Sequence, residues 1–210
     1  SMQGALVHSV NTVSVQLLMK SGIDSVIKMA DRLGFKKKLP HVPSLALGTA
    51  NASVFDVAKI YGTIANYGKQ VKPNYILRVE DNDENVLDKP VNSPGEKVIP
   101  KKTAEQITMM LRNVTERGTG RSLKSNFSFP GDVAGKTGTT QNHADGWFVG
   151  FTPKIVFAAW VGADSPKIHF QNIKYGQGAA SALPISGYFL EGLSKNRSEY
   201  FDMFKFSEID

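Results

Sequence analysis

Three strand-like runs follow one another closely in the second half of this chain, and they restrict its fold more than any other feature. They span residues 133–140, 146–152 and 155–162, and only short links separate them. A parallel crossover needs a dozen or more residues, so the runs are predicted to form an antiparallel meander. The last run is apolar on both faces, which predicts that helices cover it on both sides.

Helices are predicted both before and after these strands in the sequence. Apolar residues recur at helical spacing in five stretches, which lie near residues 12–20, 24–33, 53–64, 103–116 and 183–193. Asp24 is predicted to cap the second helix, and Ser53 with Asp56 forms a capping-box pattern at the start of the third. A small hairpin is predicted across residues 76–87. The whole pattern predicts an α+β fold in which an antiparallel sheet lies between helical layers.

Composition limits the number of domains and the kinds of partner. The 210 residues are 41% hydrophobic and 21% charged, which suffices for one sizeable core or for a large piece of a bigger domain. The net charge is +6, but the basic residues are scattered and form no face interleaved with aromatics, so no nucleic-acid partner is predicted. The chain has no cysteine, which excludes disulfides and Cys-ligated metals, and no cofactor or metal site is predicted.

The first strand-like run carries the residues that point most directly to chemistry, Gly135-Lys136-Thr137-Gly138-Thr139. A glycine inside a strand lets another backbone approach closely, which suits an extended peptide that adds as a further strand. Lys136 can place a positive charge beside a nucleophile or a substrate carboxylate. Thr137 and Thr139 can donate hydroxyl hydrogen bonds to that carboxylate, and the Thr139 N–H can form half of an oxyanion hole. The alternative is an ordinary edge strand with a protective lysine.

A second polar pair, Ser9 and Asn11, precedes the first long helical stretch. A hydroxyl and an amide two residues apart on a tight turn can point into one cleft. Ser9 can then pass a proton between a lysine and a leaving amine, and Asn11 can hold a substrate amide. The alternative interpretation is a helix cap, which is the commonest role of such residues before a helix.

Other polar and aromatic residues near the strands are given structural roles. Trp147 and Trp160 lie on adjacent predicted strands and are expected to be core residues. His143 is expected to be a solvated residue of the loop after the first strand. Asp145 is placed where it can orient that loop, and no chemistry is assigned to it.

Taken together, these motifs resemble the transpeptidase domain of the penicillin-binding proteins, and most closely the bifunctional class A type. The order Ser9-Val10-Asn11 followed by Lys136-Thr137-Gly138 matches two of the three signature motifs of these serine enzymes. The resemblance runs from about Ala5 to Leu193. It also includes three further stretches, which are residues 44–49, 64–68 and 117–120.

The resemblance implies a function and a set of site residues. The family acylates a serine with a peptidoglycan stem peptide, releases D-alanine and transfers the acyl group to an amine, and β-lactams trap the acyl-enzyme. Ser9 would be the proton-relay serine and Asn11 its substrate-binding neighbour. Lys136 would act in catalysis beside them, and Thr137, Gly138 and Thr139 would bind the substrate carboxylate.

The resemblance also implies an organisation and a location. Ser1 and Met2 are interpreted as an expression-vector scar, residues 3–198 as the C-terminal part of the transpeptidase domain, and residues 199–210 as a tail. A glycosyltransferase domain and a membrane anchor are expected upstream, with the domain on the extracytoplasmic side of the inner membrane. The longest apolar stretch, Ile155 to Ala163, is too short to be that anchor, since a span needs about 20 residues.

One departure from the family limits what this chain is expected to do. The family's nucleophile lies in an S-x-x-K motif several tens of residues before S-x-N, whereas only eight residues precede Ser9. The stretch Ser25-Val26-Ile27-Lys28 fits the pattern but follows S-x-N. We therefore expect that the chain alone cannot be acylated, because the serine and its lysine must lie within hydrogen-bond reach.

Three further expectations remain open at this point. A non-catalytic peptide-binding or scaffold module and a serine β-lactamase-like hydrolase are the alternative functions. An incomplete two-sided sheet exposes apolar surface, so a homodimer is expected as a possible assembly, which size-exclusion chromatography tests.

Overall fold

A three-stranded antiparallel sheet forms the centre of the computed structural model, which describes residues 1–90, 95–196 and 205–206. The strands are β3 (Ala134–Thr139), β4 (Asp145–Phe151) and β5 (Val156–Gly162), in the spatial order β3-β4-β5. The links between them are too short to allow any other pairing, and the predicted meander is confirmed. Its bounds differ from the predicted ones by only one residue or so at each end.

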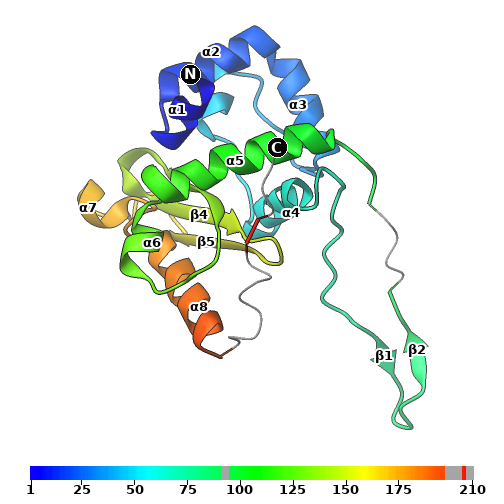
Figure 1. Cartoon of the computed structure of the whole chain (residues 1–210). Helices are drawn as coiled ribbons and strands as arrows, with labels where there is room; N and C mark the ends of the chain where they lie inside the picture. The colour runs from blue at the N-terminus through cyan, green and yellow to red at the C-terminus, as the bar shows by residue number, and fades with distance from the viewer. Residues whose placement is uncertain (91–94, 197–204, 207–210) are drawn as a thin grey trace.

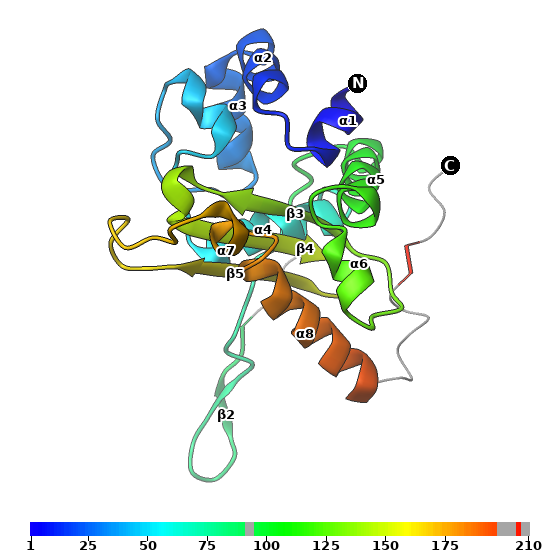
Figure 2. The same cartoon turned by 90° about the vertical axis from the view of Figure 1, so that its left-hand side faces the viewer.

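Helices cover both faces of the sheet (Figures 1 and 2). On one face α4 (Val54–Ala65) and α5 (Lys101–Arg117) pack around Phe151 of β4. On the other face α6 (Ser122–Asn126) and α8 (Ala182–Asn196) pack around Phe148. Because successive strand residues point to opposite faces, Phe148 and Phe151 serve two separate cores. The prediction of an α+β fold with helices on both sides of β5 is confirmed.

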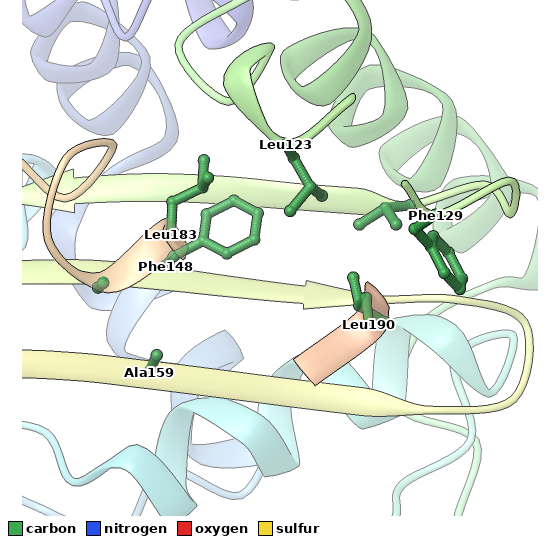
Figure 3. Packing of buried hydrophobic residues seen from close by; sticks show 8 residues of the cluster. Leu123, Phe129, Phe148, Ala159, Leu183 and Leu190 are labelled. Atoms are coloured by element: carbon green, nitrogen blue, oxygen red, sulfur yellow. The ribbon is translucent and has the colours of Figure 1, made fainter. Parts of the chain in front are cut away.

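The core under α8 is the larger of the two. Figure 3 shows Phe148 on β4 beside Leu183 of α8, with Leu190 further along the same helix and Leu123 and Phe129 on the neighbouring segments. Phe148, Leu183 and Leu190 have no exposed surface. This core holds α8 and the segment before it firmly against the α8 face of the sheet.

The remaining elements lie at the edges of this sandwich. Above α5 in Figure 1 lie three helices, α1 (Met2–Val7), α2 (Asn11–Ser21) and α3 (Ile23–Arg32). The predicted hairpin is confirmed as β1 (Val79–Glu80) and β2 (Val86–Asp88), which project away from the body. Three short helical segments complete the list, which are η1 (Pro43–Leu47), η2 (Gln141–His143) and α7 (Ile173–Gly176). None of the helices in the described ranges combines the length and the hydropathy that a membrane crossing requires.

The predicted cap of α3 is wrong. Helix α3 begins at Ile23, its N-cap residue is Gly22, and no side chain bonds to the first turn. Gly22 has a φ of 83°, a conformation that glycine adopts without strain, so the chain turns into the helix before Asp24 is reached. Asp24 lies in the first turn instead, where its negative charge interacts favourably with the helix dipole.

Both ends of the chain contain residues with structural roles. Ser1, interpreted above as vector-derived, is the N-cap of α1 and accepts a hydrogen bond from the Gly4 N–H. In the predicted tail only residues 205–206 are described, and Phe206 packs edge-on against Phe151. Its backbone N–H donates to the Asp132 carboxylate at 3.0 Å, so this part of the tail belongs to the core under α4 and α5.

The capping box of α4 is confirmed and supports a test of local stability. The Ser53 hydroxyl accepts from the Asp56 N–H, and the Asp56 carboxylate accepts from the Ser53 N–H. Replacing Ser53 with alanine is expected to lower the free energy of unfolding by about 1 kcal/mol, measured by urea denaturation. The hydrogen bond from the Ser53 hydroxyl lowers the pKa of Asp56 below its ordinary 3.8. The contribution of the carboxylate is therefore present above that pH and is lost as the pH falls through the lowered folded value.

The matched control is Ser25→Ala, because Ser25 is an exposed residue within α3. Alanine has the highest helix propensity, so this variant is expected to be as stable as the unaltered chain or slightly more stable. Equal losses in both variants would show that the capping box contributes nothing specific.

Candidate active site

Lys136 and Ser9 meet in space although 127 residues separate them in the chain. The Lys136 ammonium donates to the Ser9 hydroxyl at 3.0 Å and to the Thr137 carbonyl at 2.9 Å. Ser9 lies in the turn between α1 and α2 with a φ of 54°, a left-handed conformation that is uncommon for residues other than glycine. The N-cap residue of α2 is Val10, so Ser9 is not the cap, and its hydroxyl faces the lysine.

The turn after α5 brings α1 and β3 together. A side chain at Gly118 would overlap the Val7 carbonyl at the end of α1, so only glycine allows this approach. The Thr119 N–H donates to the same Val7 carbonyl at 3.2 Å, and the Thr119 hydroxyl pairs with that of Thr137 at 2.7 Å. The sequence analysis included this stretch in the family resemblance but gave Thr119 no role in the site. The Gly-Thr-Gly pattern after a long helix was the signal that could have located Thr119.

Burial changes the proton affinity of Lys136. Loss of hydration lowers the pKa of its ammonium from 10.5 to about 8. Burial disfavours the charged form of a lysine, and here the Ser9 hydroxyl and a carbonyl accept two of its hydrogens. The group is still mainly protonated at neutral pH, but its proton is far easier to remove than that of a solvated lysine.

A cleft of about 800 Å³ opens beside Lys136 on the α4 face of the sheet. Its walls are the segment from η1 to the start of α4 and the facing residues of the three strands. Trp147 and Trp160 line it with ring centroids 6.4 Å apart, and Trp160 is 39% exposed. The prediction that both tryptophans are core residues is therefore wrong, because in the described part of the chain both side chains line this open cleft.

Asp145 fixes the link between β3 and β4. Its carboxylate accepts from the Trp160 indole N–H at 2.8 Å and from the Thr140 hydroxyl at 3.1 Å. The Asp145 N–H donates back to the Thr140 hydroxyl at 2.9 Å. These bonds hold the end of β3 against β5 and orient one wall of the cleft, as the sequence position suggested. His143 lies in the same link, as predicted, but it is only half-exposed and its ring Nδ1 is buried.

The other predicted site residues occupy three different environments. Gly138 and Thr137 line the cleft, and the Thr137 hydroxyl is engaged by Thr119. Thr139 is exposed at the end of β3, and its hydroxyl accepts from the Gly178 N–H at 3.0 Å. Asn11 is the exposed first residue of α2 and does not line the cleft.

The S-x-x-K pattern at residues 25–28 is not part of this site. Ser25 and Lys28 are exposed on α3, and neither lines the cleft. The site that the described residues assemble therefore consists of a lysine bonded to a serine hydroxyl, next to a strand with an accessible edge.

Comparison with known proteins decides the family. The family model described as the penicillin-binding protein transpeptidase domain matches residues 1–184. The chain belongs to this family. Penicillin-binding protein 1A of Aquifex aeolicus is 39% identical over 182 residues, which are 86% of this chain and 24% of that protein. Penicillin-binding protein 1B of Haemophilus influenzae is 34% identical over 161 residues, which are 76% of this chain and 20% of that protein.

Solved penicillin-binding proteins share the fold. The crystal structure of penicillin-binding protein 1A from Haemophilus influenzae superposes with a TM-score of 0.81 at 22% identity, over 91% of this chain and 34% of that one. The structure of PonA1 from Mycobacterium tuberculosis gives a TM-score of 0.76 at 26% identity, over 92% of this chain and 56% of that one. The chain thus spans about a quarter of the length of the relatives that it matches by sequence.

Proposed function

We propose that this chain is the C-terminal part of the transpeptidase domain of a class A penicillin-binding protein, a serine enzyme that cross-links peptidoglycan stem peptides ending in D-Ala-D-Ala. The observation that carries the proposal is the bond from Lys136 to Ser9, because Lys136 lies on β3, an edge strand of the described three-stranded sheet. The two motifs that sequence reasoning named separately meet there in one site. Similarity to penicillin-binding proteins 1A and 1B supports the class A assignment.

The geometry supports a division of roles among the residues present. A stem peptide adds along β3, and Lys136 and the Thr139 hydroxyl attract its terminal carboxylate. The nucleophilic serine oxygen attacks the penultimate carbonyl carbon, while the Thr139 N–H stabilises the developing oxyanion. The C–N bond to the last D-alanine then breaks, and Ser9 relays the serine proton to the leaving amine. A neighbouring amine next attacks the acyl-enzyme and regenerates the serine.

The cleft beside Lys136 supports a place for the nucleophile. No S-x-x-K motif precedes Ser9 in this sequence, so we propose that the family's nucleophile segment lies elsewhere in the full-length protein. This cleft of about 800 Å³, with two tryptophans in its lining, leaves apolar surface exposed that a further polypeptide segment would cover. A serine carried by that segment would lie within reach of Lys136 and Ser9.

The 210-residue chain by itself is therefore expected not to be acylated. Incubation with a fluorescent penicillin, followed by denaturing gel electrophoresis, is expected to show no labelled band, whereas the full-length protein is labelled. A stable adduct on the isolated chain would contradict this expectation, and its position by mass spectrometry would identify the serine. Rapid turnover of the penicillin by the full-length protein would instead indicate a β-lactamase-like hydrolase.

We further propose that the full-length protein carries a glycosyltransferase domain and a membrane anchor, with this domain on the extracytoplasmic side. The proposal rests on the class A relatives, of which the chain spans only 24% and 20%. The reading frame upstream of this segment tests it directly. A frame without an apolar segment and a glycosyltransferase sequence would contradict it.

A further inference from the structure

The end of β3, the strand along which the substrate peptide is proposed to add, is bonded to a backbone N–H from a distant part of the chain. The Gly178 N–H donates to the Thr139 hydroxyl oxygen at 3.0 Å. Gly178 lies in the segment between α7 and α8, 39 residues from Thr139. No sequence motif named this glycine, and the roles proposed above do not use it.

Gly178 can make this contact only because it has no side chain. A methyl group at this position would overlap the carbonyl oxygens of Gly138 and Trp147. These two residues face each other in the β3–β4 pair, so the segment lies directly on the sheet. Both obstacles are backbone atoms, which cannot rotate away as a flexible side chain can.

The glycine is also anchored on its other side. Its carbonyl accepts from the Leu183 N–H at 2.9 Å in the first turn of α8. Leu183 has no exposed surface and packs beside Phe148 in the core under α8. The position of the Gly178 N–H is therefore set by the core and not by a mobile surface group.

This contact determines the direction of the Thr139 hydroxyl hydrogen. A hydroxyl has one hydrogen to donate and two lone pairs that accept. Because Gly178 occupies a lone pair, the hydrogen points elsewhere, and Thr139 is exposed at the edge where a substrate strand would add. Donation from the amide also polarises the hydroxyl and strengthens the bond that it donates.

We propose that Gly178 is a positioning residue that orients the Thr139 hydroxyl to donate to the carboxylate of the acyl donor. The inference rests on the proposed function, because it needs a ligand carboxylate at the end of β3. It predicts that Gly178 affects ligands with a free carboxylate and leaves ligands without one unaffected.

The test compares acylation of the full-length protein by a penicillin and by the methyl ester of the same penicillin. Gly178→Ala is expected to slow acylation by the acid about tenfold, the equivalent of one lost charge-assisted hydrogen bond, and to leave the rate with the ester unchanged. The matched control is Gly192→Ala on α8, where an added methyl group meets no atom within 4 Å. This variant is expected to behave like the unaltered protein with both ligands.

Two substitutions of Thr139 keep the test decisive if Gly178→Ala does not fold. Thr139→Val keeps the shape and removes the hydroxyl, so it is expected to lose about tenfold with the acid only. Thr139→Ser lacks the branched methyl group, and only the hydrogen bond from Gly178 can orient its hydroxyl. It is therefore expected to recover most of the rate with the acid that Thr139→Val loses.

The outcomes separate this inference from the function on which it rests. Equal slowing of acid and ester by Gly178→Ala, no slowing of either, or loss in Thr139→Ser as large as in Thr139→Val would overturn the positioning role alone. Failure of the unaltered full-length protein to be acylated by the acid and by the ester would overturn the proposed function and this inference with it.

Discussion

Replacing Lys136 with methionine in the full-length protein is expected to lower the rate of acylation by penicillin about a hundredfold to a thousandfold, the cost of one preorganised electrostatic donor. Methionine fills a similar volume but removes the charge and the bond to Ser9. In the proposed mechanism, the substrate carboxylate and the proton relay then both lose their partner. The rate constant for acylation, measured with a fluorescent penicillin, checks the prediction.

Lys136→Arg provides the control for charge alone. Arginine stays protonated, whereas the Lys136 ammonium, with a pKa of about 8, loses its proton as the pH rises through that value. If the charge attracts the carboxylate, acylation by the unaltered protein falls above about pH 8, and the arginine variant shows no such fall. An unchanged rate in Lys136→Met would remove Lys136 from the mechanism.

The same methionine substitution is expected to stabilise the fold, in the opposite direction to its effect on acylation. Burial lowers the pKa of Lys136 below the 10.5 of the unfolded chain, so the unfolded chain binds the proton more tightly. The free energy of unfolding therefore rises with pH between about 8 and 10.5, and below about pH 8 the charged lysine destabilises the fold. Lys136→Met is expected to add up to about 3 kcal/mol at neutral pH. Urea denaturation at neutral pH and near pH 10 checks this, since the gain should shrink at the higher pH.

Replacing Phe148 with alanine is expected to have the largest effect on stability, a loss of about 3–5 kcal/mol. Phe148 has no exposed surface and points from β4 toward α8, where it lies beside Leu183 in the buried cluster that also contains Leu190 (Figure 3). Truncation removes this apolar contact and leaves a cavity in the centre of the core. Urea denaturation of the 210-residue chain measures the change.

Phe189→Ala is the matched control, because Phe189 lies on α8 but is 49% exposed. Its loss is expected to be far smaller, since little apolar surface returns to water. A similar cost at both positions would mean that the core under α8 does not carry the stability of the fold.

Most of the secondary structure could be predicted because its causes are local. The alternation along β5 and the helical spacing in α5 are repeated over many residues, and each repeat is visible in the sequence. The short links left the strands no pairing other than an antiparallel one. The cap of α3 was missed because a single glycine, Gly22, turned the chain earlier than the polar residue suggested.

The site could be predicted only in part. Lys136 and Ser9 were named from motifs, but no pattern in the sequence states that residues 127 positions apart touch. Thr119, Asp145 and Gly178 were assigned no site role, because their contacts depend on how distant segments pack. The two tryptophans were misplaced, because strand periodicity shows which residues share a face and not whether a helix covers that face.

The family, the meander and the candidate site residues could all be inferred from the amino-acid sequence, because motifs, alternation and link lengths are local properties of the chain. Which of those residues lie close together depends on the tertiary structure. It lowered the pKa of Lys136 by burial, placed Ser9 against its ammonium, and opened the cleft beside it. It also placed Gly178 directly against β3, where its N–H bonds to the Thr139 hydroxyl. Each of these depends on distances between segments far apart in the chain, and such distances are set only when the two cores pack.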